Sequence, residues 1–274
     1  MFTDINRFAA EKRDRRGVYL IPSLFTVGNL VFGFFSLLFS FKGEYSKAAW
    51  AILAATAFDI ADGWIARFTK SSSHFGMEFD SLADFVSFGV APAFLIYQTL
   101  LVDYGKLGII IALLFVIAGA IRLARYNIKV EKMGILYFQG LPIPVAGCIL
   151  ASLVIVYYML IQNNIQGTIP FVMKEVPLLW KMIPLLMVIL AYLMISNIPY
   201  NSFKGYKLAK SKPLRYLILA ILVGIIIWLY PENMILIILV AYTLSGIIDT
   251  MLRFYRMRRA VKKMRGQMKP KLTE

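Results

Sequence analysis

Long apolar segments make up most of this sequence and limit the folds that it can adopt. Eight of them follow one another along the sequence, each close to the roughly 20 residues that a helix needs to cross a bilayer. The chain is therefore predicted to be an all-α polytopic membrane protein, with six helices followed by two more. The predicted spans are residues 18–41, 46–68, 79–101, 106–127, 141–162, 177–199, 214–230 and 233–254.

The distribution of positive charge predicts the orientation of these spans. The chain has 59% hydrophobic residues and a net charge of +15, and its Lys and Arg residues gather in alternate connections between the spans. By the positive-inside rule, both termini then face the cytoplasm. Four parts are expected: a cytoplasmic interfacial helix in 1–17, a six-helix core in 18–205, two further spans in 206–256, and a basic tail in 257–274 against anionic headgroups.

Four aspartates stand in or beside the second and third predicted spans, where carboxylates are costly and mark functional sites. Asp59 and Asp62 are three residues apart, and Asp80 and Asp84 are four apart. Each pair therefore lies on one face of a helix. Because the second span ends and the third begins at the cytoplasmic side, the two pairs reach similar depths. We expect all four carboxylates to share one site.

Other polar residues are expected at the same depth, near the cytoplasmic ends of their helices. This convergence predicts a pocket that opens to the cytoplasm and, laterally, to lipid. The polar residues are Thr26 and Asn29 in the first span, Arg122 and Arg125 at the end of the fourth, and Ser196, Asn197 and Tyr200 at the end of the sixth.

The ligand chemistry of such a cluster favours a hard cation. Carboxylates packed together repel one another unless they are protonated or neutralised by metal. Oxygen ligands without cysteine are typical of Mg²⁺ or Mn²⁺, and two such ions would suit phosphate chemistry. Gly63 and Ala66 leave space on the face of Asp59 and Asp62, and Arg67 carries a charge for a phosphate.

The spacing of these residues resembles the CDP-alcohol phosphatidyltransferase family, whose signature is D-x2-D-G-x2-A-R-x8-G-x3-D-x3-D. The match runs from Asp59 to Asp84 without a departure. Further stretches resemble the phosphatidylserine synthase branch of that family. They are Ile21-Pro-Ser-Leu-Phe-Thr26 with Asn29, Asp80 to Pro92, Arg122-Leu-Ala-Arg-Tyr-Asn127 and Gly140-Leu-Pro-Ile-Pro144.

The resemblance covers about residues 15–205 and implies a homodimeric membrane enzyme, expected in a prokaryotic inner membrane with its site facing the cytoplasm. It implies that Asp59, Asp62 and Asp80 bind metal, and that Asp84 is both a metal ligand and the catalytic base. The residues that it assigns to the CDP moiety are Thr26, Asn29, Gly63, Ala66, Arg67 and Gly76.

The reaction implied by the resemblance is attack by the hydroxyl of L-serine on CDP-diacylglycerol, which gives phosphatidylserine and CMP. Asp84 would accept the serine proton while metal ions stabilise the leaving phosphate. Serine also carries a carboxylate, and a guanidinium can bind a carboxylate through two hydrogen bonds. We therefore expect Arg122 or Arg125 to bind serine.

Two alternatives remain open at this point. Within the same chemistry, the acceptor could be glycerol 3-phosphate or an inositol compound, or the donor could be an archaeal ether lipid. From a different class, an ion-coupled transporter would also cluster carboxylates in a membrane. Ion binding alone, however, does not require the long-range spacing with Gly63, Ala66 and Arg67.

Overall fold

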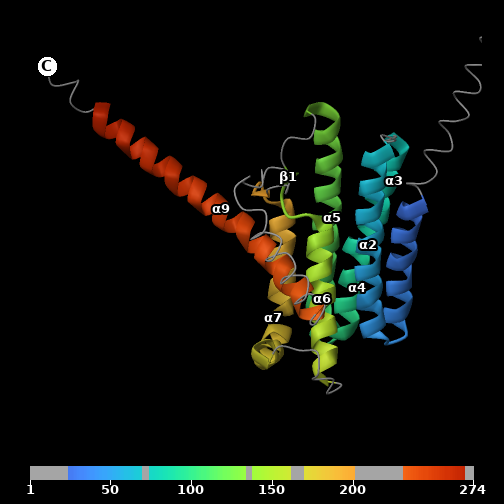
Figure 1. Cartoon of the computed structure of the whole chain (residues 1–274). Helices are drawn as coiled ribbons and strands as arrows, with labels where there is room; N and C mark the ends of the chain where they lie inside the picture. Colours follow the sequence, from blue (N-terminus) through green and yellow to red (C-terminus); the bar gives the residue numbers. More distant parts are fainter. Residues whose placement is uncertain (1–23, 70–73, 134–137, 162–169, 201–230, 269–274) are drawn as a thin grey trace, which may run out of the picture.

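The part of the protein that the structure describes is almost entirely helical (Figure 1). The computed structural model describes residues 24–69, 74–133, 138–161, 170–200 and 231–268. The predicted interfacial helix in residues 1–17 and the predicted span 214–230 lie outside these residues.

The described helices follow the predicted spans in order, and one irregular turn interrupts the third. After the first helix (Leu24–Phe41) come α2 (Tyr45–Thr69), α3 (His74–Asp84), a π-helix (Phe85–Val90), α4 (Ala91–Thr99) and a 3₁₀ turn (Leu101–Tyr104). Then follow α5 (Lys106–Met133), α6 (Ile143–Ile161), α7 (Pro170–Ile195) and α9 (Pro231–Met268). Two short strands, β1 (Phe138–Gln139) and β2 (Pro199–Tyr200), pair antiparallel with Phe138 opposite Tyr200.

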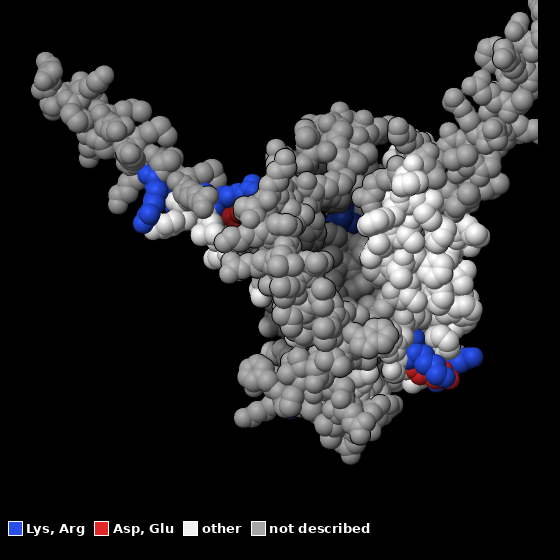
Figure 2. Space-filling view, in the orientation of Figure 1, with Lys and Arg blue, Asp and Glu red and all other residues white. Residues whose placement is uncertain are grey.

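The lengths and composition of these helices are those of an integral membrane protein. Among the described residues, five segments are long and apolar enough to cross a bilayer: Leu24–Phe41, Tyr45–Ala66, His74–Thr99, Lys106–Ile128 and Asn233–Arg253. Shorter apolar stretches cover Ile143–Met159 in α6 and Trp180–Ile195 in α7. On the right-hand side of Figure 2, an uncharged surface extends above a cluster of charged side chains at the lower end.

The centre of the bundle is α6, which packs against α2, α7 and α9. Its side chains are buried without interruption from Ala146 to Val156. A helix that is apolar on every side suits this position, because no face of it has to meet water. Of the site-bearing helices, α2 therefore packs directly on this apolar core, and α3 is connected to it through the π-helix.

The first helix is fitted tightly against its neighbours through two glycines. A Cβ on Gly28 would come within 2.7 Å of Cε1 of Phe58 in α2, and a Cβ on Gly33 within 2.8 Å of the Cα of Ser87 in the π-helix. Small residues allow this close approach of helices in a membrane. The approach brings the polar residues of the first helix beside α2 and α3.

Several helices are longer than the predicted spans, because hydropathy detects the membrane-crossing part of a helix and not its whole length. Helix α5 ends at Met133 and not at residue 127, and α7 begins at Pro170 and not at residue 177. The third helix begins at His74, not at residue 79, so Asp80 and Asp84 lie beyond its first turn. The last helix continues to Met268 instead of ending near 254. Its basic extension is rich in Arg and Lys, which favour helix as strongly as most apolar residues do.

Candidate active site

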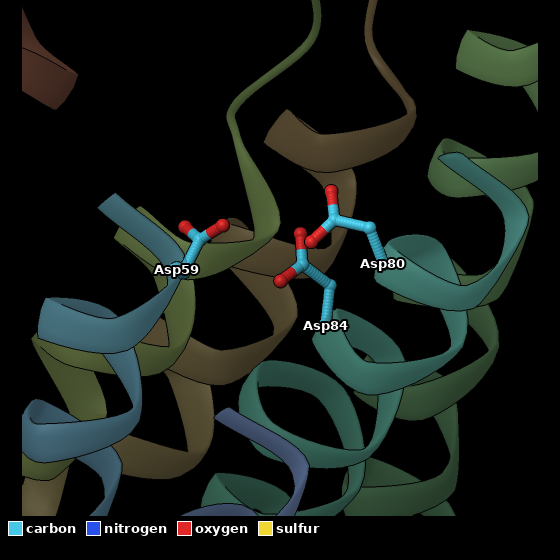
Figure 3. A group of neighbouring side chains, drawn as sticks. All are labelled: Asp59, Asp80 and Asp84. Carbon is cyan, nitrogen blue, oxygen red and sulfur yellow. The ribbon is translucent and has the colours of Figure 1, made fainter. Parts of the chain in front are cut away.

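Three of the four aspartates meet at one point between α2 and α3. Ligand oxygens of Asp59, Asp80 and Asp84 all lie within 4.8 Å of one another. Figure 3 shows Asp59 on one helix facing the other two across the gap. Asp84 is only 9% exposed, and Asp59 and Asp80 are half-buried. The predicted convergence of the two helix faces is confirmed for these three residues.

Asp62 lies next to this group but is turned toward the first helix. Its Oδ2 accepts a hydrogen bond from the hydroxyl of Thr26. Its charge nevertheless acts on both Asp59 and Asp80, so it belongs to the same electrostatic environment. Thr26 thus holds one Asp62 oxygen, and the other is left for a further partner.

Asn29 connects Asp84 to the first helix. Its Nδ2 donates to Asp84 Oδ1 at 3.1 Å, and the Asn29 side chain is fully buried. Its backbone carbonyl accepts from Ser87 Oγ at 2.9 Å, one helical turn beyond Asp84. Asn29 is therefore held from both sides, and it fixes the orientation of the Asp84 carboxylate.

The backbone after Asp84 is a π-helix, Phe85–Val90. Such wide turns are rare and are found mostly at functional sites. The sequence carries no signal that predicts this turn, since its residues are apolar or small and the packing of Ser87 onto Gly33 depends on two distant helices.

Arg122 approaches the acid group from α5. It is 8% exposed, and its guanidinium lies 5.7 Å from the ring centre of Tyr126. Among the described residues, its buried Nε has no hydrogen-bond partner. A buried guanidinium that has an N–H group without a partner can donate a hydrogen bond to an anion.

Arg125 has a different environment. Its Nη1 donates to the backbone carbonyl of Ile195, and its Nη2 donates to Asn197 Oδ1 at 2.7 Å. These contacts tie α5 to the end of α7. The sequence could not distinguish the two arginines, but their surroundings differ. Arg122 is buried and has an Nε without a partner among the described residues, whereas Arg125 joins two helices.

The remaining residues predicted at the site lie on α2 after its aspartates and on α3 before its aspartates. Gly63 and Ala66 follow Asp62 in α2, and Gly76 lies in the first turn of α3. Gly63 is exposed, and Ala66 and Gly76 are half-buried. The side chain of Arg67 lies outside the described part of the structure.

A polar network that the sequence did not predict joins α3 to α5 near the site. Asn127 Nδ2 donates to Glu78 Oε2 at 3.2 Å, and Ser81 Oγ donates to Asn127 Oδ1 at 3.2 Å. One indication of this network was present in the sequence, since Asn127 is the last residue of the stretch from Arg122 to Asn127 that resembles the family branch. The network fixes the first turns of α3 against α5, and with them the position of Asp80.

The donor atoms of the site fit a hard divalent cation. Among the described residues, buried Oδ1 atoms of Asp62, Asp80 and Asn29 have no hydrogen-bond partner. Buried polar atoms are otherwise almost always paired. Several carboxylates around unpaired oxygens form a set of ligands for Mg²⁺ or Mn²⁺ rather than for a softer ion.

Comparison with known proteins agrees with the family resemblance of the aspartate signature. The family model for CDP-alcohol phosphatidyltransferase matches residues 19–179, which include all four aspartates, Arg122 and Arg125. The chain is 33% identical to the CDP-diacylglycerol–serine O-phosphatidyltransferase of Helicobacter pylori, over 84% of this chain and 91% of that protein.

Other relatives match about half of the chain. A CDP-diacylglycerol–serine O-phosphatidyltransferase of Bacillus subtilis is 36% identical over 50% of this chain and 76% of its own length. An archaetidylserine synthase of Methanothermobacter thermautotrophicus is 42% identical over 48% of this chain and 56% of its own length.

Proposed function

The chain belongs to the CDP-alcohol phosphatidyltransferase family, and we propose that it transfers the phosphatidyl group of CDP-diacylglycerol to the hydroxyl of L-serine, giving phosphatidylserine and CMP. One observation carries the proposal. The aspartates of the family signature lie together, with ligand oxygens of Asp59, Asp80 and Asp84 within 4.8 Å. The Helicobacter pylori relative, matched over most of both chains, supports serine as the acceptor.

The reacting atoms follow from the chemistry of the two substrates. The serine oxygen attacks the phosphorus that carries the diacylglycerol, and the bond from that phosphorus to the oxygen of CMP breaks. Asp84 accepts the proton of the serine hydroxyl and later releases it to water. The hydrogen bond from Asn29 at 3.1 Å supports this role, because it holds one Asp84 oxygen and leaves the other for the proton.

Asp59, Asp62, Asp80 and Asp84 would hold the metal. Their four negative charges are matched by two divalent ions, and the buried unpaired oxygens of Asp62 and Asp80 support ligation there. Mg²⁺ or Mn²⁺ bound at these residues would neutralise charge on the diphosphate as CMP leaves. Gly63, Ala66, Arg67 and Gly76, with Thr26 from the first helix, would contact the CDP moiety.

We assign the serine carboxylate to Arg122 rather than to Arg125. The Arg122 guanidinium is buried beside the acid group, and among the described residues its Nε has no partner. Arg125 already donates to Ile195 and Asn197. Arg122 would thus hold the acceptor at one end while Asp84 takes the proton at the other.

The proposal includes the setting of the enzyme. The family resemblance supports a homodimer, and the positive charge of alternate connections supports a site that faces the cytoplasm of a prokaryotic cell. Lateral access from the bilayer would deliver the lipid donor.

We expect serine to be the preferred acceptor in a direct comparison. Purified protein would be incubated with CDP-diacylglycerol and Mn²⁺ or Mg²⁺, and CMP release compared for serine, glycerol 3-phosphate, inositol and inositol phosphate. A site built around the serine carboxylate should favour serine by about a hundredfold or more. Faster CMP release with another acceptor would mean that this other compound, and not serine, is the substrate. No CMP release with any acceptor would refute the proposed enzymatic activity. Repeating the assay with the archaeal ether analogue of CDP-diacylglycerol tests which lipid donor the enzyme prefers.

A further inference from the structure

The π-helix Phe85–Val90, which follows Asp84, is packed against glycines from three other helices. A Cβ on Gly33 would come within 2.8 Å of the Cα of Ser87, and a Cβ on Gly147 within 2.8 Å of the carbonyl oxygen of Phe88. Glycines allow backbones to approach this closely in a membrane. The wide turn is therefore held by its backbone on three sides. The three glycines are Gly33 of the first helix, Gly119 of α5 and Gly147 of α6.

This turn sets the direction in which the aspartates of α3 point. The amide of Ala91 donates to the carbonyl of Val86, five residues earlier, whereas an α-helix bonds four residues back. In Figure 3, Asp80 and Asp84 stand on α3, which continues directly into the π-helix. Because an α-helix rotates by about 100° per residue, one extra residue turns both carboxylates by about that angle relative to α4. Their position opposite Asp59 thus depends on the wide turn.

A side-chain hydrogen bond ties the π-helix to the first helix. Ser87 Oγ donates to the backbone carbonyl of Asn29 at 2.9 Å, and both residues are fully buried. A helical side chain covers the turn that precedes it, so the missing side chain of Gly33 leaves this carbonyl open to Ser87. The side chain of Asn29 donates in turn to Asp84 Oδ1 at 3.1 Å. Asn29 therefore holds the chain on both sides of the point where the helix widens.

We propose that Ser87 is a positioning residue for the metal site, whose hydrogen bond keeps the π-helix in the register that brings the two aspartates of α3 to Asp59. The inference deepens the proposed function, because it rests on metal bound by these aspartates. The Ser87 hydroxyl donates to a carbonyl of the first helix, so it acts on the metal through the backbone and not as a ligand. Contacts that orient metal ligands strengthen metal binding, and their loss weakens it.

Replacing Ser87 with alanine tests the inference through metal binding alone. The melting temperature of Ser87→Ala would be measured without substrate over a titration of Mn²⁺. We expect the Mn²⁺ concentration that gives half of the stabilisation to rise about three- to tenfold, the range of one hydrogen bond. The matched control is Ser152→Ala, which removes a hydroxyl that is equally buried but has no hydrogen-bond partner among the described residues. This control should leave the Mn²⁺ concentration for half-stabilisation unchanged.

The variant Gly33→Ala disturbs the same contact from the side of the first helix. Its Cβ would come within 2.8 Å of the Ser87 Cα, which forces the two backbones apart. We expect the Mn²⁺ concentration for half-stabilisation to rise about tenfold or more. Ser87→Ala adds no atoms, so it decides the question even if Gly33→Ala does not fold.

A purely structural role for Ser87 would lower the melting temperature with and without Mn²⁺ and leave the half-stabilising concentration unchanged. That result would overturn the inference, as would no effect of Ser87→Ala or an equal rise in Ser152→Ala. Failure of the proposed function would look different, because the unaltered protein would then release no CMP with serine, whereas the Mn²⁺ titration is read without substrate.

Discussion

Replacing Asp84 with asparagine is expected to lower kcat for CMP release on the order of a thousandfold. Asparagine keeps the shape of the side chain and can still meet Asn29, but it can neither accept a proton nor offer a charged ligand to a metal. Both roles proposed for Asp84 are lost in one substitution. The measurement is CMP formation with saturating serine and CDP-diacylglycerol, in protein whose melting temperature has been checked.

Two further variants make this result specific. Asp249→Asn alters a carboxylate that is also within an apolar helix but only pairs with Arg253 at 2.8 Å, so activity should be kept. Asn29→Ala removes the 3.1 Å hydrogen bond that orients Asp84, and about a tenfold loss is expected, as for residues that orient metal ligands. Near-normal activity of Asp84→Asn would rule out its role as base.

Removing divalent metal is expected to abolish activity and to lower the melting temperature. Without cations, the four carboxylates of the site repel one another, and the buried oxygens of Asp62 and Asp80 are left unpaired. Ions that bind the folded protein at about 100 times their Kd stabilise it by about 2.7 kcal/mol. Both activity and thermal stability should return on addition of Mg²⁺ or Mn²⁺.

The thermal readout tests metal binding apart from catalysis. Metal-dependent stabilisation should disappear in Asp59→Asn and persist in Asp249→Asn, which alters only an exposed ion pair. Full activity in chelator, with metal shown to be absent by elemental analysis, would contradict the assignment of the aspartates. Stabilisation that survives Asp59→Asn would place the ions elsewhere.

The meeting of the aspartates was predictable because it depends on local periodicity. Spacings of three and four residues put Asp59 with Asp62, and Asp80 with Asp84, on single helix faces. The direction of each span then places both pairs near the same membrane surface. These two steps need no knowledge of how the helices pack, and they were enough to bring Asp59, Asp80 and Asp84 together.

The details that depend on packing were not predictable. The rotation of Asp62 toward Thr26, and the π-helix after Asp84, follow from how the first helix fits against α2 and α3. The different partners of Arg122 and Arg125 depend on where α7 ends. A helix end that is rich in Lys and Arg looks the same in the sequence whether its arginines bind a ligand or tie two helices together.

The packing of the last helix against the bundle was hidden for a similar reason. Gly246 offered the one local hint, since a glycine within a span marks a close approach of another element. Only the position of Tyr200 shows which element approaches.

The most direct test of transfer to serine follows the oxygen atom of the serine hydroxyl. L-Serine labelled with ¹⁸O in that hydroxyl would be incubated with CDP-diacylglycerol and the purified protein, and the products analysed by mass spectrometry. Attack by serine on the lipid-bearing phosphorus predicts that each phosphatidylserine molecule retains the label and that CMP contains none. Unlabelled phosphatidylserine, label in CMP, or phosphatidic acid as the main lipid product would contradict it.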